Sequence, residues 1–432
     1  MTGQVQRVLS AVIDGRAQTP RYIQKQLAQL YDALQKAKPA IHNAIRHDTE
    51  YSSAEADSEI FLAMKVVKQQ YEAFNWEEFL DQEYSLAHSK DNLSRRVPIG
   101  CVYIIPSQHN RFYSIILPAC AAIAAGNCVM VEISQTLLQL GALLRKIFAA
   151  SMDRDTFAVV ESKPADADLF KHCIVVDGRA ESTSPASFQV LSSPASRTIA
   201  IVDRTSIVKK AAQDIVRARF AFCGRSPYAP DLVLVNEFVF EEFCNAAARH
   251  ATERFGSKVS VHSIRSLDDA IDLVNSRSTT PLRAAYLFAV PPAAKYLSQF
   301  IYARISFTDH IPADLLIGPP APVTSPTSVH PRYTKEMFST LSPQYITQSS
   351  QHSILSQLLD QDNRAAQAKI NAEISAPLPP MNEPLGKAIG FFEQGLLTGG
   401  VVAIVSAVTG LAFMTKYAGP SVIQGVRYMI AS

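Results

Sequence analysis

The spacing of apolar residues predicts helices at the start of the chain. Between residues 20 and 80 apolar positions recur every three or four residues, as at Ile23, Leu27 and Leu30, with polar residues between them. This spacing places the apolar side chains on one face of a helix. We therefore expect two or three amphipathic helices, packed on a core, before the first strand.

Short apolar runs bounded by turn residues predict buried strands. Val97–Pro106 begins near one proline and ends at another, and Cys128–Val131 follows an alanine-rich helix that stops at Gly126-Asn127. A strand buried on both faces has a continuous apolar sequence. The apolar length of residues 117–132 would also fit a membrane span, but the Gly-Asn break and the flanking strands favour a β-α-β core.

The alternation of strands and helices continues to about residue 310. Helices are expected at 135–148, 206–222, 241–253 and 268–276, and strands at 158–159, 173–176, 198–202 and 285–290. Such alternation implies mostly parallel, doubly wound sheets, with a second α/β unit from about residue 203. The Ser/Pro/Ala-rich residues 178–197 should form a loop or a crossing linker. The Pro-rich stretches after Ile317 favour extended linkers over packed elements.

Composition is that of a folded protein with two or three domains. The chain has 432 residues, of which 47% are hydrophobic and 19% charged, and its net charge of +2 argues against a nucleic-acid binder. Its six cysteines have no CxxC or Cys/His spacing, which supports neither a metal site nor a disulfide framework. We expect reduced, mostly buried thiols and no bound metal.

The two ends of the chain differ in hydropathy. The N-terminus lacks the continuous apolar core of a signal peptide. From Gln394 to Thr415 there is no charged residue; as a helix this stretch would be about 33 Å long, enough to cross a bilayer core of roughly 30 Å. Its glycines would also suit a helix buried in an oligomer interface. The Pro-rich tether and the Gly395-x-x-x-Gly399 spacing favour a single-pass C-terminal membrane anchor, with the main domain in the cytosol.

Several segments resemble, in order, landmarks of the aldehyde dehydrogenases, in particular the class 3 or fatty-aldehyde type. They are GRAQTPRYIQKQLAQLYDAL, VPIGCVYIIP, LPACAAIAAGNCVMVE, CGRSPYAPDLVLV and SLDDAIDLVNSRSTTPL, all between about residues 5 and 345. In an active member a cysteine thiolate attacks the aldehyde, while an asparagine amide and a backbone N–H hold the oxyanion. Hydride then leaves to NAD(P), and a glutamate activates the water that releases the acid.

The resemblance implies an aldehyde-dehydrogenase-like α/β fold with two doubly wound α/β domains and a C-terminal hydrophobic helix. The expected parts are an N-terminal helical part of the nucleotide-binding domain (1–95), a degenerate Rossmann-like nucleotide-binding domain (96–202), a catalytic-type α/β domain (203–315), a Pro-rich closing segment and linker (316–390), a transmembrane helix (391–415) and a short polar or amphipathic tail (416–432).

The resemblance also indicates that the family's nucleophile is missing. Its position falls on Pro227, which has no nucleophilic group, and the Gly-Gln pair before it becomes Gly224-Arg225. Cys223 is the nearest thiol. We interpret Cys223 as a packing residue; the alternative is a substitute nucleophile, whose pKa Arg225 would lower if it lay close.

Two further catalytic positions have changed. The oxyanion asparagine corresponds to His109, with Asn110 one residue later, so a one-residue slip would restore an amide donor. His109 suggests a general base, but we expect a solvated loop histidine. The family's glutamate corresponds to Ser193, which cannot serve as that base.

The cofactor positions are also altered. Glu132 replaces the lysine that contacts the adenosine ribose, which should repel NADP most and leaves NAD conceivable, because a carboxylate can accept from ribose hydroxyls. Only Asp177-Gly178-Arg179 stands where the glycine-rich phosphate turn is expected, and a helix N-terminus without close-packed glycines holds phosphate poorly. NAD is therefore the candidate cofactor.

Two functions are compatible with these observations. The first is an aldehyde dehydrogenase-like pseudoenzyme without the catalytic Cys and Glu, which binds or scaffolds at a membrane as a homo- or heterodimer with an aldehyde-dehydrogenase-like chain. The alternative is a divergent NAD-dependent dehydrogenase that uses Cys223 to oxidise a lipophilic aldehyde to a carboxylic acid in lipid or secondary metabolism. We favour the first, because nucleophile, base, oxyanion donor and phosphate turn have all changed together.

Overall fold

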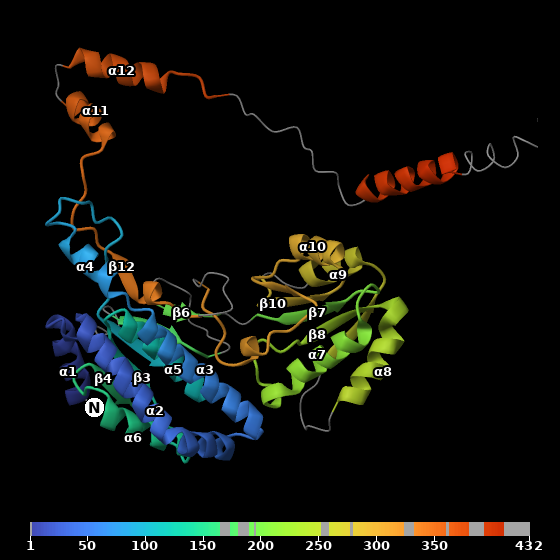
Figure 1. The fold of residues 1–432 in the computed structure, drawn as a ribbon, viewed down its shortest axis with the longest axis horizontal. Coiled ribbons are helices and arrows are strands. Elements are labelled where there is room, and N and C mark those ends of the chain that lie inside the picture. The colour runs from blue at the N-terminus through green and yellow to red at the C-terminus, as the bar shows by residue number, and fades with distance from the viewer. Residues whose placement is uncertain are drawn as a thin grey trace, which may run out of the picture. The chain divides into compact units, whose positions relative to one another are not determined.

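Two parallel sheets and the helices that cover them form the larger part of the protein (Figure 1). The chain divides into two compact units, Met1–Thr347 and Gln348–Ser432, and both sheets belong to the first. The computed structural model describes residues 2–164, 173–179, 190–193, 196–251, 259–276, 280–323, 332–359, 363–379 and 393–409.

The first sheet has the strand order β4-β3-β2-β5-β6, with every neighbouring pair parallel. Parallel strands end at one edge of the sheet, so residues that follow these strands lie near one another. The strands are β2 (Cys101–Ile105), β3 (Cys128–Glu132), β4 (Phe157–Val160), β5 (Cys173–Asp177) and β6 (Val190–Ser192).

Helices cover both faces of the first sheet. Alternate residues of β2 point to opposite faces: Val102 and Ile104 join the main core, whereas Cys101 and Tyr103 pack with Val8 of α1. The helices on the main-core face are α2 (Pro20–Asp48), α3 (Ser53–Glu72), α5 (Arg111–Ala124) and α6 (Gln139–Ser151), and α1 (Thr2–Ile13) lies on the other face.

The α5 helix explains the most apolar stretch in the first half of the chain. It is buried along nearly its whole length between the sheet and its neighbouring helices. It ends before Gly126, whose φ of 84° is the left-handed conformation predicted from the Gly-Asn break. A short antiparallel pair, β1 (Arg96–Pro98) with β12 (Ser339–Leu341), and the exposed helix α4 (Trp76–Tyr84) complete this half.

The second sheet has the order β11-β10-β7-β8-β9 and is also parallel. Figure 1 shows α7 and α8 on one face and α9 and α10 on the other. The elements are β7 (Thr198–Val202), α7 (Val208–Phe220), β8 (Leu232–Asn236), α8 (Phe240–His250), β9 (Ser260–Ile264), α9 (Leu267–Ser276), β10 (Ala284–Phe288), α10 (Pro291–Phe300) and β11 (Ser306–Thr308). The predicted doubly wound α/β fold is confirmed.

The Pro-rich stretch after Ile317 is packed more tightly than its composition predicts. Ile317, Tyr333 and Phe338 are buried, and Arg332 is fully buried. The guanidinium of Arg332 donates to the carbonyls of Leu315 and Pro319. The expectation of an extended linker is therefore wrong for residues 317–338 in their described part, because the hydrogen bonds of the buried Arg332 hold this segment in a packed conformation.

The second unit contains α11 (Ser350–Leu359), α12 (Arg364–Ile374) and a helix at 393–409. The side chains of the helix at 393–409 are exposed. Among the described residues, no helix combines the length and the apolar character that a membrane span requires. The end of the expected transmembrane segment and the expected tail at 416–432 lie outside the described residues.

Candidate functional site

The turn that corresponds to the catalytic loop joins α7 to β8 and has an unusual backbone. Phe222, Cys223 and Gly224 all have positive φ angles, of 52°, 57° and 68°. A residue with a Cβ pays about 1–2 kcal/mol for this left-handed conformation. Two such residues in succession persist only where the surroundings hold them.

The N-terminal end of α3 holds this turn. Glu55 Oε1 accepts a hydrogen bond from the Phe222 N–H at 2.8 Å, and the same carboxylate forms the capping box with Ser52. The Phe222 ring lies edge-on to Tyr51 and to His109, with ring centroids 5.3 and 5.7 Å away. The turn is thus fixed by residues far earlier in the chain, with Glu55 167 positions before Phe222.

Pro227, at the predicted nucleophile position, is buried and serves as a structural anchor. Its carbonyl accepts from Arg283 Nη1 at 2.8 Å and from Thr198 Oγ1 at 3.3 Å. Both donors are themselves buried: Thr198 begins β7, and Arg283 directly precedes β10. This backbone position can therefore orient the start of β8, but it offers no reactive side-chain atom.

Cys223 is half-buried and Arg225 is exposed. The two lie in the same turn, and the effect of Arg225 on the thiol stays a prediction. A cavity of about 520 Å³ opens beside the turn, between α3, α7 and the segment around Leu316. Glu55, Phe222 and Leu316 line it, whereas Cys223 and Pro227 are not among its described lining residues.

His109 is buried, so the expectation of a solvated loop histidine is wrong. Its Nε2 donates to the Leu316 carbonyl at 2.8 Å, which leaves Nδ1 to accept from the Tyr51 hydroxyl at 3.3 Å. Burial lowers the pKa of His109 to about 4, and the charges of Arg332 and Arg225 act in the same direction. The imidazole is neutral at pH 7 and both ring nitrogens are engaged.

Asn110 is buried, and its amide is engaged by protein groups. Its Nδ2 donates to Glu59 Oε2 at 3.0 Å, and its Oδ1 accepts from the Gly318 N–H at 3.1 Å. Glu59 also accepts from the Tyr113 N–H at 3.1 Å. Burial raises the pKa of Glu59 to about 7, against the opposing effect of these hydrogen bonds.

Ser193, at the predicted position of the catalytic glutamate, is buried just after β6. Among the described residues, no hydrogen bond or ion pair joins it to the Cys223–Pro227 turn. His109, Tyr51 and the Phe222–Cys223 turn form one cluster, to which Asn110 is attached next in the chain.

The residues at the carboxyl edge of the first sheet pair with one another. The Tyr103 hydroxyl donates to Glu132 Oε2 at 2.5 Å, and the buried Asp177 carboxylate accepts from Arg179 Nε and Nη2 at 2.8 and 2.6 Å. A Cβ on Gly178 would lie 2.9 Å from the Ile105 carbonyl oxygen, so only glycine fits there.

This edge fits a dinucleotide poorly in its described part. A phosphate cradle needs backbone N–H groups at a glycine-rich helix start. Here β3 and β5 end instead in carboxylates, Glu132 and Asp177. Residues 180–189, which include the predicted turn to the next strand, lie outside the described residues. The described residues contain no group of three or more His, Cys, Asp or Glu side chains placed to hold a metal ion.

Sequence reasoning missed Tyr51, Glu55 and Glu59, which build the inner wall of the site. All three belong to or flank α3, where the periodic pattern indicated only a core-facing helix. The one available signal was the Ser52-x-x-Glu55 spacing of a capping box. Nothing in the spacing reveals that Glu55 also reaches Phe222.

Comparison with known proteins identifies the family that this fold and site resemble. The aldehyde dehydrogenase family model matches residues 10–175. A 4,4'-diaponeurosporen-aldehyde dehydrogenase of Staphylococcus aureus is 24% identical over 254 residues, 54% of each chain. Aldehyde dehydrogenase family 3 member A2 of Mus musculus is 22% identical over 360 residues, 76% of this chain and 71% of the relative.

Solved structures agree on the fold. A substrate-bound Staphylococcus aureus AldH has a TM-score of 0.64 at 16% identity, over 81% of this chain and 94% of that one. KauB, an aldehyde dehydrogenase of Pseudomonas aeruginosa, has a TM-score of 0.62 at 12% identity, over 80% and 88%. The chain is therefore an aldehyde dehydrogenase-like protein.

Its curated relatives include several members of aldehyde dehydrogenase family 3, so the likeness is to that branch. The match spans about half the length of the first two relatives, 54% of the Staphylococcus aureus enzyme and 56% of family 3 member B3 of Mus musculus.

Proposed function

We propose that this aldehyde dehydrogenase-like protein lacks the covalent chemistry of the family and has a binding or scaffolding role. The observation that supports it most is the buried Pro227, held through its carbonyl by Arg283 and Thr198 where the resemblance expects the nucleophile. Without a nucleophile the covalent route loses many orders of magnitude in rate. The engaged nitrogens of His109 and Asn110 support the same proposal.

The alternative is a divergent NAD-dependent oxidation of a lipophilic aldehyde by Cys223. Its support is the half-buried thiol on a left-handed turn, since strained backbone gathers at functional sites. Two relatives are named as dehydrogenases of 4,4'-diaponeurosporen-aldehyde and 4,4'-diapolycopene-4,4'-dial. The Cys223 thiolate would add to the carbonyl carbon, the adduct would pass hydride to NAD, and water would cleave the thioester to the acid.

The test that separates these functions is turnover by the purified full chain with NAD or NADP and medium- to long-chain aldehydes, followed by absorbance at 340 nm. We expect no rate above the protein-free blank. Cys223→Ser is the decisive variant and Cys244→Ser its matched control, because both thiols are half-buried. Turnover that Cys223→Ser abolishes and Cys244→Ser retains would establish the alternative and exclude the pseudoenzyme.

NAD is the cofactor we propose for any remaining nucleotide binding, and we expect it to be weak. Glu132 places a negative charge where the resemblance expects the adenosine ribose contact, and this charge would disfavour the additional phosphate of NADP most. Titration calorimetry with both nucleotides tests this. Submicromolar binding of NADP would contradict it.

We propose that the protein is anchored to a membrane by the uncharged stretch from Gln394 to Thr415. Its described part, residues 393–409, is helical and exposes Leu396, Val402 and Ile404. Carbonate extraction of membranes tests the proposal by comparing the full chain with a chain that ends at residue 390. The full chain should stay in the membrane pellet, and its release together with the truncated chain would refute the anchor.

We also propose a homo- or heterodimer with an aldehyde-dehydrogenase-like chain. The support is an exposed apolar row on α4, formed by Trp76, Leu80 and Tyr84 at helical spacing, with 38%, 43% and 53% of their surface exposed. Light scattering after size-exclusion chromatography tests the homodimer. A monomer that also fails to co-purify with an active aldehyde dehydrogenase would contradict the proposal.

A further inference from the structure

A groove of about 830 Å³ runs along the outer edge of the first sheet, away from the turn at Cys223. Its floor is the five consecutive residues Phe157–Glu161. Side chains of consecutive strand residues point to opposite faces, so a cavity lined by all five follows the edge of the strand. One wall is α1, which packs on one face of the sheet, and the other is α6, which packs on the other face.

The edge of β4 that faces this groove has no strand partner among the described residues, where β4 pairs only with β3. The Thr156 carbonyl accepts from the Val129 N–H in β3, and the Val160 carbonyl accepts from the Ile133 N–H directly after β3. Backbone groups of successive residues alternate in direction, so the N–H and C=O of Val159 face the groove. Unpaired edges of this kind accept an added strand.

The size of the groove matches a strand. Five extended residues are about 16 Å long, and a strand in a sheet occupies about 4.8 Å by 10 Å in cross-section, which gives roughly 800 Å³. The 830 Å³ of the groove therefore fits one extended peptide segment between the two helices.

The groove is positively charged, so an acidic peptide segment would suit it best. Arg7, Arg145 and Arg154 line it with one acid, Glu161, which already accepts from Gln135. In the described part of the chain none of the three arginines forms an ion pair. Their three positive charges against one negative charge leave +2 in this groove, and guanidinium groups pair best with carboxylates or phosphates.

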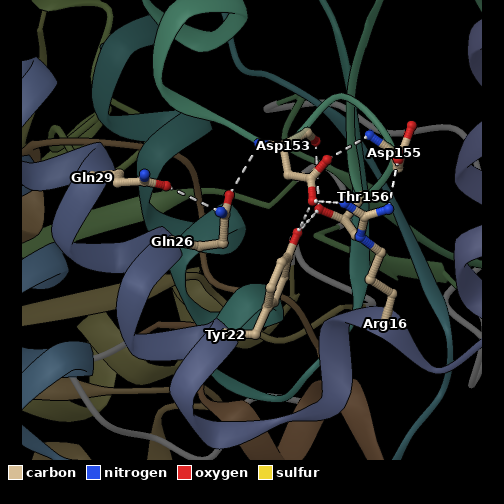
Figure 2. A network of polar contacts seen from close by, with 7 residues as sticks. All are labelled: Arg16, Tyr22, Gln26, Gln29, Asp153, Asp155 and Thr156. Carbon is tan, nitrogen blue, oxygen red and sulfur yellow. Dashed lines mark hydrogen bonds and ion pairs between the residues drawn. The ribbon is translucent and has the colours of Figure 1, made fainter.

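A polar network ties the segment after α1 to the turn that precedes β4 (Figure 2). Arg16, just after α1, forms ion pairs of 2.9 and 2.7 Å with Asp153 and Asp155, the neighbours of Arg154. The Tyr22 hydroxyl donates to Asp153 Oδ2 at 2.9 Å and lies 2.6 Å from Thr156 Oγ1. The helix that carries Arg7 and the turn that carries Arg154 are thus fixed to each other before any ligand binds.

We propose that this groove binds an extended acidic peptide segment of a partner protein, which adds to the first sheet as a strand beside β4. Backbone hydrogen bonds to Val159 give the affinity. Acidic side chains facing the two helical walls meet Arg7, Arg145 and Arg154 and select the segment. The interaction is independent of catalysis and of the membrane anchor.

The experiment is fluorescence anisotropy with the full chain and a labelled peptide, VEEVEEV, compared with VKKVKKV and with VEEVEEV that is N-methylated at alternate residues. Micromolar binding is expected for the first peptide alone. N-methylation removes the donors that a strand needs and leaves the charge unchanged. Equal binding of the N-methylated peptide, displacement by millimolar inorganic phosphate at constant ionic strength, or no binding of VEEVEEV at 1 mM would each overturn the proposal.

Charge-reversal variants locate the site. Arg7→Glu and Arg154→Glu should each weaken binding about tenfold or more, whereas Lys146→Glu, the same change on an exposed neighbour outside the groove lining, should change it less than about twofold. Val159→Pro should abolish binding, because it removes an outward N–H and leaves the bonds from β4 to β3 intact. Unchanged binding in Arg7→Glu and Val159→Pro, with unchanged melting temperatures, would contradict the proposal.

Discussion

The turns at residues 153–156 and 222–227 are both held by residues from the N-terminal part of the chain, but by different kinds of interaction. Figure 2 shows the first, where Arg16 and Tyr22 meet Asp153 in a charged, partly exposed network. The second has two non-glycine residues in the left-handed conformation and is held by Glu55 and aromatic packing. The first turn exposes Arg154 to solvent, whereas Phe222 and Pro227 of the second turn are buried.

The turn at residues 222–227 is a structural joint between the two halves of the first unit. Phe222, in the second half of the chain, contacts three residues of the first half. Its N–H donates to Glu55, and its ring packs against Tyr51 and His109. The carbonyl of Pro227 is held by Thr198 of β7 and by Arg283, which directly precedes β10. The joint thus ties the helices of the first sheet to the second sheet whether or not the turn carries out chemistry.

Removal of the hydrogen bond from Arg283 to the Pro227 carbonyl should lower the free energy of unfolding most. Arg283→Met leaves the buried Pro227 carbonyl without its donor at 2.8 Å and should lower the free energy of unfolding by about 3 kcal/mol. Urea unfolding measures this. The matched control is the exposed Arg225→Met in the same turn, which should change the stability by less than about 0.5 kcal/mol. Equal effects of the two substitutions would contradict the role of Pro227 as an anchor.

The buried Glu59, beside the same joint, should make the stability of the protein depend on pH. The pKa of Glu59 is raised to about 7, so the folded protein holds a proton that the unfolded chain releases near pH 4. Stability should therefore fall as pH rises from about 4 to 7, by roughly 3 kcal/mol from this group. Glu59→Gln should remove most of that slope in urea unfolding between pH 5 and 8. An unchanged slope would show that Glu59 is ionised throughout.

A smaller effect is expected at the carboxyl edge of the first sheet. Gly178→Ala places a Cβ 2.9 Å from backbone atoms of Ile105 and Ser107, which must shift. We expect a loss of about 1–3 kcal/mol, seen as a lower melting temperature. Gly399→Ala is the control, because nothing lies within 4 Å of its added Cβ. A neutral Gly178→Ala would mean that this edge is loosely packed.

Substitution in the charged turn at residues 153–156 should lower the stability least. Asp153→Asn weakens the bonds to Arg16 and Tyr22 and should cost about 1 kcal/mol, because the network is partly exposed. Partial burial alone would raise the pKa of Asp153, but bonds from the Asp155 N–H, Tyr22 and Arg16 lower it. Its contribution is present above the ordinary pKa near 4 and is lost as pH falls below it. A constant difference between wild type and variant from pH 7 to 3 would contradict this.

The fold could be predicted from local pattern, whereas the inner wall of the site could not. Apolar runs predicted the buried strands β2, β3, β5, β7 and β10, and Gly126 predicted the end of α5, because these features depend on neighbouring residues. The prediction of a loop at residues 178–197 was wrong for β6, and β9 and β11 were not predicted, because these strands have no long apolar run of their own. The burial of His109 depends on the Leu316 carbonyl, 207 residues away, and that of Glu59 on Asn110, 51 residues away. No spacing within a helix or loop reveals such partners.

The most direct test of the central claim is whether Cys223 ever carries the acyl group. The full chain would be incubated with NAD and dodecanal, quenched in acid and digested, and the peptide that contains Cys223 would be examined by mass spectrometry. We predict an unmodified thiol, because Pro227 stands where the resemblance places the nucleophile and the turn serves as a structural joint. A dodecanoyl thioester on Cys223, absent when NAD is left out, would contradict it.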